Sequence, residues 1–298
     1  MATEQQDRLA LDEFLEAAAT DVAWAAPATM IYAAAGTRRA AALAGIAADS
    51  EAYASWSRGQ MIAACRLIFA HGVQHLFTIL AAPGQFREVG RHRERLLEWI
   101  DWGTAGPEAL DDFRALGWRV RLIGVDTIDR LAHAAARLRA LPAADGEPTL
   151  WLWVIPDEDA PWRWQCQALQ EPVPARSDAI CALYGEPVPR ASLFLGFGKP
   201  AVADYLLPPL LGETVHCYWT QRPGYSLTQD ELRQILFDYA CVRPTWRNDK
   251  SGRSEAALAD RALWEREAIL GLGRRVGPFW YPVLPADVAA PDGGERGS

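Results

Sequence analysis

Apolar runs of strand length alternate with helix-like segments along almost the whole chain, and this alternation limits the possible folds more than any other feature. We expect strands at residues 28–32, 76–80, 119–124, 150–155, 192–195 and 215–219. We expect helices at residues 4–19, 53–70, 87–102, 128–141, 178–184 and 255–270, and two more directly after Arg39 and Thr228. Because composition does not change along the chain, the pattern predicts an α/β fold with a single open, mostly parallel sheet covered by helices. We place an N-terminal helix in residues 1–27, one domain at residues 28–288 and a flexible tail at residues 289–298.

Composition narrows the class of protein. The 298-residue chain has a formal net charge of −8, which argues against nucleic-acid binding. Its five cysteines are scattered without a Cys-x-x-Cys pair, so they indicate buried thiols in a reducing cytoplasm rather than a zinc or disulfide framework. No apolar run reaches the length of a transmembrane helix, and the acidic N-terminal segment is unlike a signal peptide. We therefore expect a cytoplasmic protein.

The first glycine turn is the strongest local signal for a ligand. Ala35, Gly36, Thr37, Arg38 and Arg39 follow the strand expected at residues 28–32 and precede a helix. Backbone N–H groups and the positive end of a helix dipole meet at such a junction, and arginine side chains add donors that fit phosphate oxygens. The turn is therefore a candidate site for a small anion, while an ordinary turn followed by a solvated helix face is the more frequent case for such a segment.

A second glycine turn, with Gly196 and Gly198, follows the strand expected at residues 192–195. Ligands of open α/β sheets bind at the carboxyl ends of the strands, where both glycine turns are expected to lie. Asp204 comes shortly after the second turn. It either caps a helix, which is the more frequent use of an aspartate in that position, or binds a metal or polarises a water.

Three further side chains are candidates for catalysis. Four arginines between residues 87 and 95 surround His92, and neighbouring positive charge favours a neutral imidazole that can act as a base. A solvated basic helix face explains that segment equally well. Tyr53 and Trp56 open the helix expected at residues 53–70, where aromatic side chains more often belong to a core or a rim than to a catalytic site.

Several motifs occur along the chain in an order that is typical of one protein family. They are Ala35-Gly36-Thr37-Arg38-Arg39-Ala40, Leu67-Ile68-Phe69-Ala70-His71-Gly72, Tyr184-Gly185-Glu186, Leu193-Phe194-Leu195-Gly196-Phe197-Gly198, Pro223-Gly224-Tyr225-Ser226-Leu227-Thr228, and the arginines Arg243 and Arg247. With further matches they span residues 28–281. The chain thus resembles the cis-prenyltransferase superfamily, and within it the divergent branch of the tuberculosinol synthases.

The resemblance implies the cis-prenyltransferase fold and a terpene synthase. Such an enzyme would ionise a prenyl diphosphate, here of the bicyclic diterpenyl type, and would release diphosphate together with a neutral alcohol or hydrocarbon. The diphosphate would be bound by Ala35, Gly36, Thr37, Arg38, Arg39, Gly196 and Gly198. Tyr53 would face the carbocation, His92 or Asp204 would transfer the proton, and Trp56 and Arg243 are further candidates. A class II diterpene cyclase would supply the substrate, and the family implies a homodimer.

The chain departs from that branch at functional positions. Ala35 stands where the branch has aspartate, Ala40 where it has tryptophan, and His92 where it has tyrosine. Without the carboxylate at residue 35 the usual Mg²⁺ ligand or general base is absent, so a Mg²⁺ requirement stays open. Leu195 and Ala201 replace the arginines of chain-elongating relatives, which makes elongation with isopentenyl diphosphate improbable. Two alternatives remain: a non-catalytic subunit that binds prenyl diphosphate, and a prenyl transferase to a small nucleophile such as a nucleoside.

Overall fold

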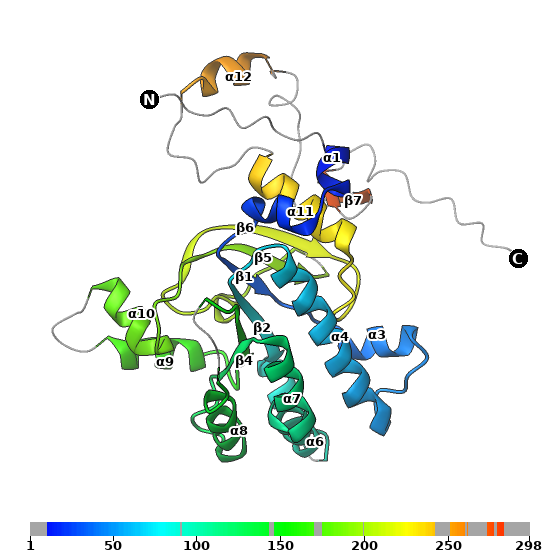
Figure 1. Ribbon diagram of the computed structural model, residues 1–298, viewed down its shortest axis with the longest axis vertical. Helices are drawn as coiled ribbons and strands as arrows, with labels where there is room; N and C mark the ends of the chain where they lie inside the picture. The colour runs from blue at the N-terminus through cyan, green and yellow to red at the C-terminus, as the bar shows by residue number, and fades with distance from the viewer. Residues whose placement is uncertain are drawn as a thin grey trace, which may run out of the picture.

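A parallel sheet forms the centre of the molecule. The computed structural model describes residues 11–89, 91–142, 146–169, 175–198, 200–241, 251–259, 261, 273–276 and 279–282. Within these residues the sheet contains β1 (Thr29–Tyr32), β2 (His75–Ala81), β3 (Arg119–Ile123), β4 (Thr149–Val154), β5 (Ala191–Phe197) and β6 (Gly212–Thr220). The order is β3-β4-β2-β1-β5-β6, and all neighbouring strands are parallel (Figure 1). The predicted single parallel sheet is confirmed.

The helices connect the strands and cover the sheet. Within the described residues they are α1 (Leu11–Glu16), α2 (Ala19–Val22), α3 (Thr37–Leu43), α4 (Glu51–Ala70), α5 (Pro83–Phe86), α6 (Arg91–Ala105), α7 (Pro107–Leu116), α8 (Asp129–Arg139), α9 (Ala160–Ala168), α10 (Arg176–Tyr184), α11 (Gln229–Cys241) and α12 (Arg253–Ala259), with 3₁₀ turns η1 (Ala23–Ala25) and η2 (Asp204–Leu206). In that part of the chain no helix is both long and apolar enough to cross a membrane.

Side chains of the strands alternate between two cores. Met30 and Tyr32 point into the larger core, which contains side chains of α4, α6, α8 and α11, whereas Ile31 points into the smaller core with α10. Every residue of β4 is buried because the strand is covered on both faces, while β3 at the sheet edge alternates in burial as its sequence predicts. Figure 1 shows α9 and α10 set apart from the group of α4, α6, α7 and α8.

Several element boundaries differ from the predictions. The single N-terminal helix expected at residues 4–19 is two short helices, α1 and α2, in the described part. The helix expected after Arg39 begins at Thr37, so both arginines lie inside its first turn. The helix expected at residues 87–102 is shifted to α6, and α7, α9 and the antiparallel pair β7 (Gly273–Val276) and β8 (Phe279–Pro282) were not predicted. The expected tail at residues 289–298 and most of residues 260–270 lie outside the described residues.

The start of α11 shows how local sequence sets one of these boundaries. Thr228 and Glu231 form the predicted capping box: the Glu231 N–H donates to Thr228 Oγ1 (3.3 Å), and the Thr228 N–H donates to Glu231 Oε2 (3.1 Å). Glu231 also accepts a hydrogen bond from Arg222 Nε at 2.7 Å. These contacts fix the loop between β6 and α11, which reaches the carboxyl end of β1.

Candidate functional site

The first glycine turn leads from the carboxyl end of β1 directly into α3. Gly36 has a left-handed backbone conformation (φ 81°, ψ 26°), and a Cβ atom there would lie 3.1 Å from Phe197 and Pro223. The first helical hydrogen bonds run to the Gly36 carbonyl, from the N–H groups of Arg39 (2.9 Å) and Ala40 (3.1 Å). The turn thus presents the start of a helix and two arginines at one point, an arrangement that suits an anion.

The turn opens into a cavity of about 700 Å³ at the carboxyl ends of the strands. Its lining includes Ala33, Ala34, Ala35, Gly36, Thr37, Arg38, Arg39, Ile79, Leu80, Ala82, Gln85, Glu88, Phe194, Gly196, Phe197, Ala201, Tyr205, Leu206, Trp219 and Tyr225. Because β1 and β5 are neighbours in the sheet, the two glycine turns meet at this cavity, as predicted. The structure therefore brings six of the predicted diphosphate-binding residues together: Ala35, Gly36, Thr37, Arg38, Arg39 and Gly196.

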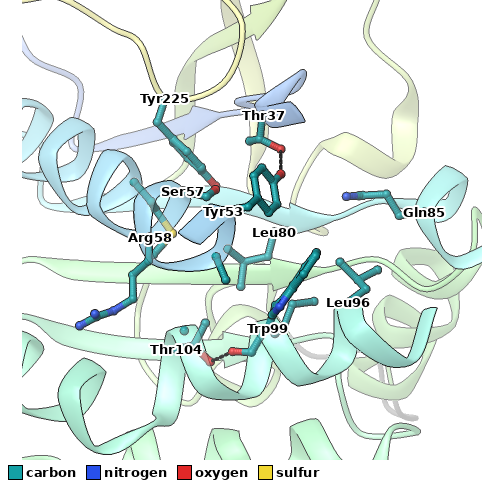
Figure 2. A pocket seen from close by; sticks show the side chains of 14 residues that line it. Thr37, Tyr53, Ser57, Arg58, Leu80, Gln85, Leu96, Trp99, Thr104 and Tyr225 are labelled. Carbon is teal, nitrogen blue, oxygen red and sulfur yellow. Dashed lines mark hydrogen bonds between the residues drawn. The ribbon is translucent and has the colours of Figure 1, made fainter. Parts of the chain in front are cut away.

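A smaller cavity of about 120 Å³ lies beside the first, between α4 and α6 (Figure 2). Thr37, Leu80, Gln85 and Tyr225 line both cavities, so the small cavity continues the large one. Its other lining residues are Tyr53, Ala54, Ser57, Arg58, Met61, Leu96, Trp99, Ile100, Gly103 and Thr104. Most of these side chains are apolar or aromatic, and we call this small cavity the apolar pocket.

Tyr53 connects the apolar pocket with the glycine turn. Its hydroxyl group lies 2.8 Å from Thr37 Oγ1, the contact drawn as a dashed line in Figure 2. The Tyr53 ring lies 5.4 Å from the Trp99 ring between centroids, and the residue is only 8% exposed. Two aromatic rings therefore border the space directly behind the turn, where ring faces can stabilise positive charge.

Tyr225, which lines both cavities, packs against Tyr32, which lines neither. The rings of Tyr32 and Tyr225 pack edge to face at 5.9 Å. Burial raises the pKa of both hydroxyl groups above the usual tyrosine value. Both phenols are therefore neutral at physiological pH, where they can donate hydrogen bonds but do not act as bases.

The two arginines of the turn have different surroundings. Arg38 Nη2 donates to both carboxylate oxygens of Glu88, at 3.0 and 3.2 Å. The Arg39 guanidinium lies 5.6 Å from the centroid of the Phe197 ring, within the range of a cation–π contact. Each arginine thus has a neighbour that limits its movement at the cavity.

The loop before α11 supports the turn from behind. The Gly224 N–H donates to the Ala35 carbonyl (2.7 Å), and the Tyr32 hydroxyl donates to the Gly224 carbonyl (3.3 Å). A Cβ atom on Gly224 would lie 2.9 Å from the Ala40 Cβ. Ala40 is buried against this loop, so the small residue at the position where the branch has tryptophan is explained by the close approach of the backbone.

Other predicted residues lie apart from the cavity or outside the described residues. Asp204 is exposed at the start of η2, where its carboxylate accepts the Tyr205 N–H at 2.8 Å; Tyr205 lines the large cavity, and Asp204 does not. Trp56 is half-buried on α4 and lines neither cavity. The Gly198 N–H donates to the Thr220 carbonyl. The side chain of His92, which is in the first turn of α6, and all of Arg243 lie outside the described residues, so every catalytic role stays a prediction.

The structure also adds residues that the sequence reasoning missed. Trp99, Gln85 and Glu88 border the two cavities, and Trp219 forms part of the wall near β5. Gln85 and Glu88 follow the carboxyl end of β2, so the rule that ligands bind at that edge could have indicated them. Trp99 carries no such signal, because its place depends on how α6 packs against α4.

Positive charge is confined to one side of the large cavity. Among the described residues that line it, Arg38 and Arg39 are the cationic ones; Lys199 lies outside the described residues. Leu195 is fully buried in the sheet, and Ala201 lines the cavity without any charge. The described residues therefore provide cations for one diphosphate group.

The donor set also bears on metal binding. Among the described residues that line the large cavity, Glu88 is the one with a carboxylate. In the described part of the chain, no cluster of three His, Cys, Asp or Glu side chains could hold a metal ion. Mg²⁺ is commonly bound by one or two carboxylates together with substrate phosphates. The residues present therefore fit Mg²⁺ only in combination with a bound diphosphate.

Solved structures identify the fold. A probable undecaprenyl diphosphate synthase from Campylobacter jejuni superposes with a TM-score of 0.54 at 13% identity, covering 74% of this chain and 98% of that one. Lavandulyl diphosphate synthase from Lavandula x intermedia, solved with dimethylallyl diphosphate, gives 0.53 at 12% identity, covering 73% and 97%. The chain therefore has the cis-prenyltransferase fold, as the resemblance implied.

Sequence relatives give the family. The chain is 48% identical over 274 residues to (+)-kolavelool synthase of Herpetosiphon aurantiacus. The aligned residues cover 91% of this chain and 95% of that protein. The chain is 37% identical over 70 residues, or 24% of this chain and 23% of that protein, to tuberculosinyl adenosine transferase of Mycobacterium tuberculosis. No protein-family model matches the chain. The chain belongs to the family of terpene synthases that includes (+)-kolavelool synthase, an enzyme family of cis-prenyltransferase fold.

Proposed function

We propose that the protein is a diterpene synthase that ionises a bicyclic diterpenyl diphosphate and releases a neutral terpene alcohol or hydrocarbon. The observation that carries this proposal is the direct connection between the arginine-bearing turn and the apolar pocket through the Thr37–Tyr53 hydrogen bond. The identity to (+)-kolavelool synthase supports the diterpenyl substrate class.

The chemistry follows from this arrangement. The allylic C–O bond breaks with both electrons leaving on the diphosphate, whose charge Arg38, Arg39 and the first N–H groups of α3 stabilise. The cation that remains faces Tyr53 and Trp99, which stabilise it without forming a bond. It is neutralised when water attacks and loses a proton, or when a neighbouring carbon loses a proton directly. We expect His92 to accept the proton, as the resemblance implies; Asp204, the other candidate, lines neither cavity.

Product analysis tests this proposal. The purified protein is incubated with geranylgeranyl diphosphate, and separately with bicyclic diterpenyl diphosphate formed in the same vessel by a class II diterpene cyclase. Gas chromatography with mass spectrometry then identifies hydrocarbons and alcohols, and a colorimetric assay measures released diphosphate. We expect product from the bicyclic substrate, and less product with Arg39→Ala at limiting substrate concentration. If the protein converts neither substrate, the proposal is overturned. An elongated diphosphate as product would instead show a prenyl transferase.

A nucleoside as nucleophile is the second candidate. It is favoured by the similarity to tuberculosinyl adenosine transferase and by the aromatic residues Phe197 and Trp219 in the cavity wall, on which a nucleobase can stack. Adding adenosine to the same incubation and searching for a prenylated nucleoside by liquid chromatography and mass spectrometry distinguishes the two functions.

Partners remain proposals as well. We expect a class II diterpene cyclase to provide the substrate, and we expect a homodimer from the resemblance. Analytical ultracentrifugation measures the oligomeric state, and co-expression with a cyclase tests whether product forms from geranylgeranyl diphosphate.

A further inference from the structure

Glu88 occupies a special place at the large cavity. It follows α5 at the carboxyl end of β2, and its carboxylate accepts two hydrogen bonds from Arg38 Nη2. Ala35, three residues before Arg38, lines the same cavity but has no polar side chain. Among the described lining residues Glu88 is the one with a carboxylate, and it reaches the cavity from a different strand than Ala35 does.

The position next to Arg38 brings a carboxylate and a diphosphate together. A diphosphate held by Arg38 and Arg39 has several anionic oxygens at the mouth of the cavity, within the same lining as Glu88. Mg²⁺ binds where carboxylate and phosphate oxygens converge, and it keeps several waters as its other ligands. One carboxylate is too few to hold the ion alone, but it is enough when the diphosphate supplies further oxygens.

We propose that Glu88 is the protein ligand of a Mg²⁺ ion that binds together with the diphosphate, and that it replaces the carboxylate missing at residue 35. This inference rests on the proposed function only in requiring a diphosphate at Arg38 and Arg39. It implies that the protein alone has little affinity for Mg²⁺, since the described residues contain no complete metal site. Mg²⁺ and diphosphate must then each strengthen the binding of the other, because coupling between two ligands is reciprocal.

Binding of inorganic diphosphate to the substrate-free protein, measured by isothermal titration calorimetry with and without Mg²⁺, tests the inference without turnover. In the wild type we expect Mg²⁺ to increase the affinity by about tenfold or more. In Glu88→Gln we expect this increase to disappear, while binding without Mg²⁺ stays equal or becomes tighter because a negative charge is removed. Glu158→Gln is the matched control, because Glu158 pairs with Arg87 at 2.9 Å and does not line the cavity.

A double variant separates a metal ligand from a residue that only orients Arg38. Ala35 is exposed and lines the same cavity, so Glu88→Gln combined with Ala35→Asp should recover the Mg²⁺ effect. Electron paramagnetic resonance of Mn²⁺ with diphosphate should show line broadening beyond that of the protein-free Mn²⁺–diphosphate complex in the wild type and in the double variant, and less of it with Glu88→Gln alone. An unchanged Mg²⁺ effect in Glu88→Gln would overturn the inference. So would equal weakening with and without Mg²⁺, or a wild type that shows no Mg²⁺ effect or does not bind diphosphate. Product formation in the separate assay would leave the proposed function standing in each case.

Discussion

The Tyr53 hydroxyl group lies 2.8 Å from Thr37 Oγ1, so a side chain of the apolar pocket is hydrogen-bonded to the turn that carries the two arginines. This contact joins α4 to the start of α3 across the boundary of the two cavities. A leaving group on one side and a cation on the other must stay aligned during ionisation, and a hydrogen bond at this boundary fixes the two sides relative to each other.

Removing that hydrogen bond should lower the rate of ionisation. Tyr53→Phe and Thr37→Val each delete one partner, and each should reduce kcat by about two- to tenfold, the value of one buried hydrogen bond. The double variant Tyr53→Phe/Thr37→Val should lose little more than either single variant, because both remove the same interaction. Single-turnover kinetics with the diterpenyl substrate measures this. Fully additive losses would mean that the two residues act independently.

The left-handed backbone at Gly36 makes this position intolerant of a side chain. Gly36→Ala should reduce the free energy of unfolding by about 1–2 kcal/mol, because φ is 81° and the new Cβ would crowd Phe197 and Pro223. It should also weaken diphosphate binding. The matched control is Gly59→Ala in α4, where nothing lies within 4 Å; it should stabilise the protein by about 0.5–1 kcal/mol. Thermal and urea denaturation measure both changes, and equal effects of the two variants would contradict the prediction.

Arg39 should contribute strongly to diphosphate affinity. Arg39→Ala should weaken binding of inorganic diphosphate by about tenfold to a hundredfold, the range for losing a hydrogen-bonded charge. Arg87→Ala removes an exposed arginine that pairs with Glu158 and lies outside both cavities, so its affinity should equal the wild type. Calorimetry gives both values. An unchanged affinity in Arg39→Ala would place the anion elsewhere.

Buried His71 should make stability depend on pH. Its Nδ1 lies 2.8 Å from the Leu67 carbonyl, and its Nε2 accepts a hydrogen bond from Arg233 Nε at 3.2 Å. Burial lowers the pKa of His71, and the positive charge of Arg233 lowers it further. Below about pH 6.5 the unfolded chain therefore binds a proton that the folded protein does not, so the free energy of unfolding falls as pH decreases from that value through the lowered pKa of the folded state.

Comparison with a variant isolates this contribution. His71→Gln keeps an acceptor for Arg233 but cannot bind the proton, so its stability should fall less steeply than that of the wild type below about pH 6.5. Urea denaturation at a series of pH values gives both curves. Parallel curves would show that His71 is protonated equally in both states.

The strands could be predicted well because their signals are local. Residues 150–155 are uniformly apolar and form β4, buried on both faces, one residue earlier than expected. By contrast, the predicted range 215–219 is too short for β6, which begins at Gly212. Its first residues, including Gly212 and Thr214, lack the apolar pattern by which a strand is predicted. The start of α7 was missed although Pro107 follows Gly106, a combination typical of a helix beginning.

The candidate site also has a part that could be predicted from local sequence and a part that could not. Both glycine turns could be placed at one edge of the sheet because strand direction alone determines which ends meet. The pocket beside them could not be predicted, since Trp99 comes from α6 and reaches Tyr53 only through the packing of two helices. The resemblance does not predict Glu88 for a related reason: it indicates a carboxylate only at residue 35, whereas the cavity obtains its carboxylate from the loop after β2.

The contact between Ala40 and Gly224 has an evolutionary consequence. With only 2.9 Å between the Ala40 Cβ and a Cβ built on Gly224, residue 224 cannot carry a side chain while both backbones stay in place. Residue 224 should therefore remain glycine among relatives, and a side chain there requires a displaced loop before α11. Since that loop also holds the Ala35 carbonyl, one substitution on the hidden side of the turn can change the shape of the anion site without touching any residue that faces it.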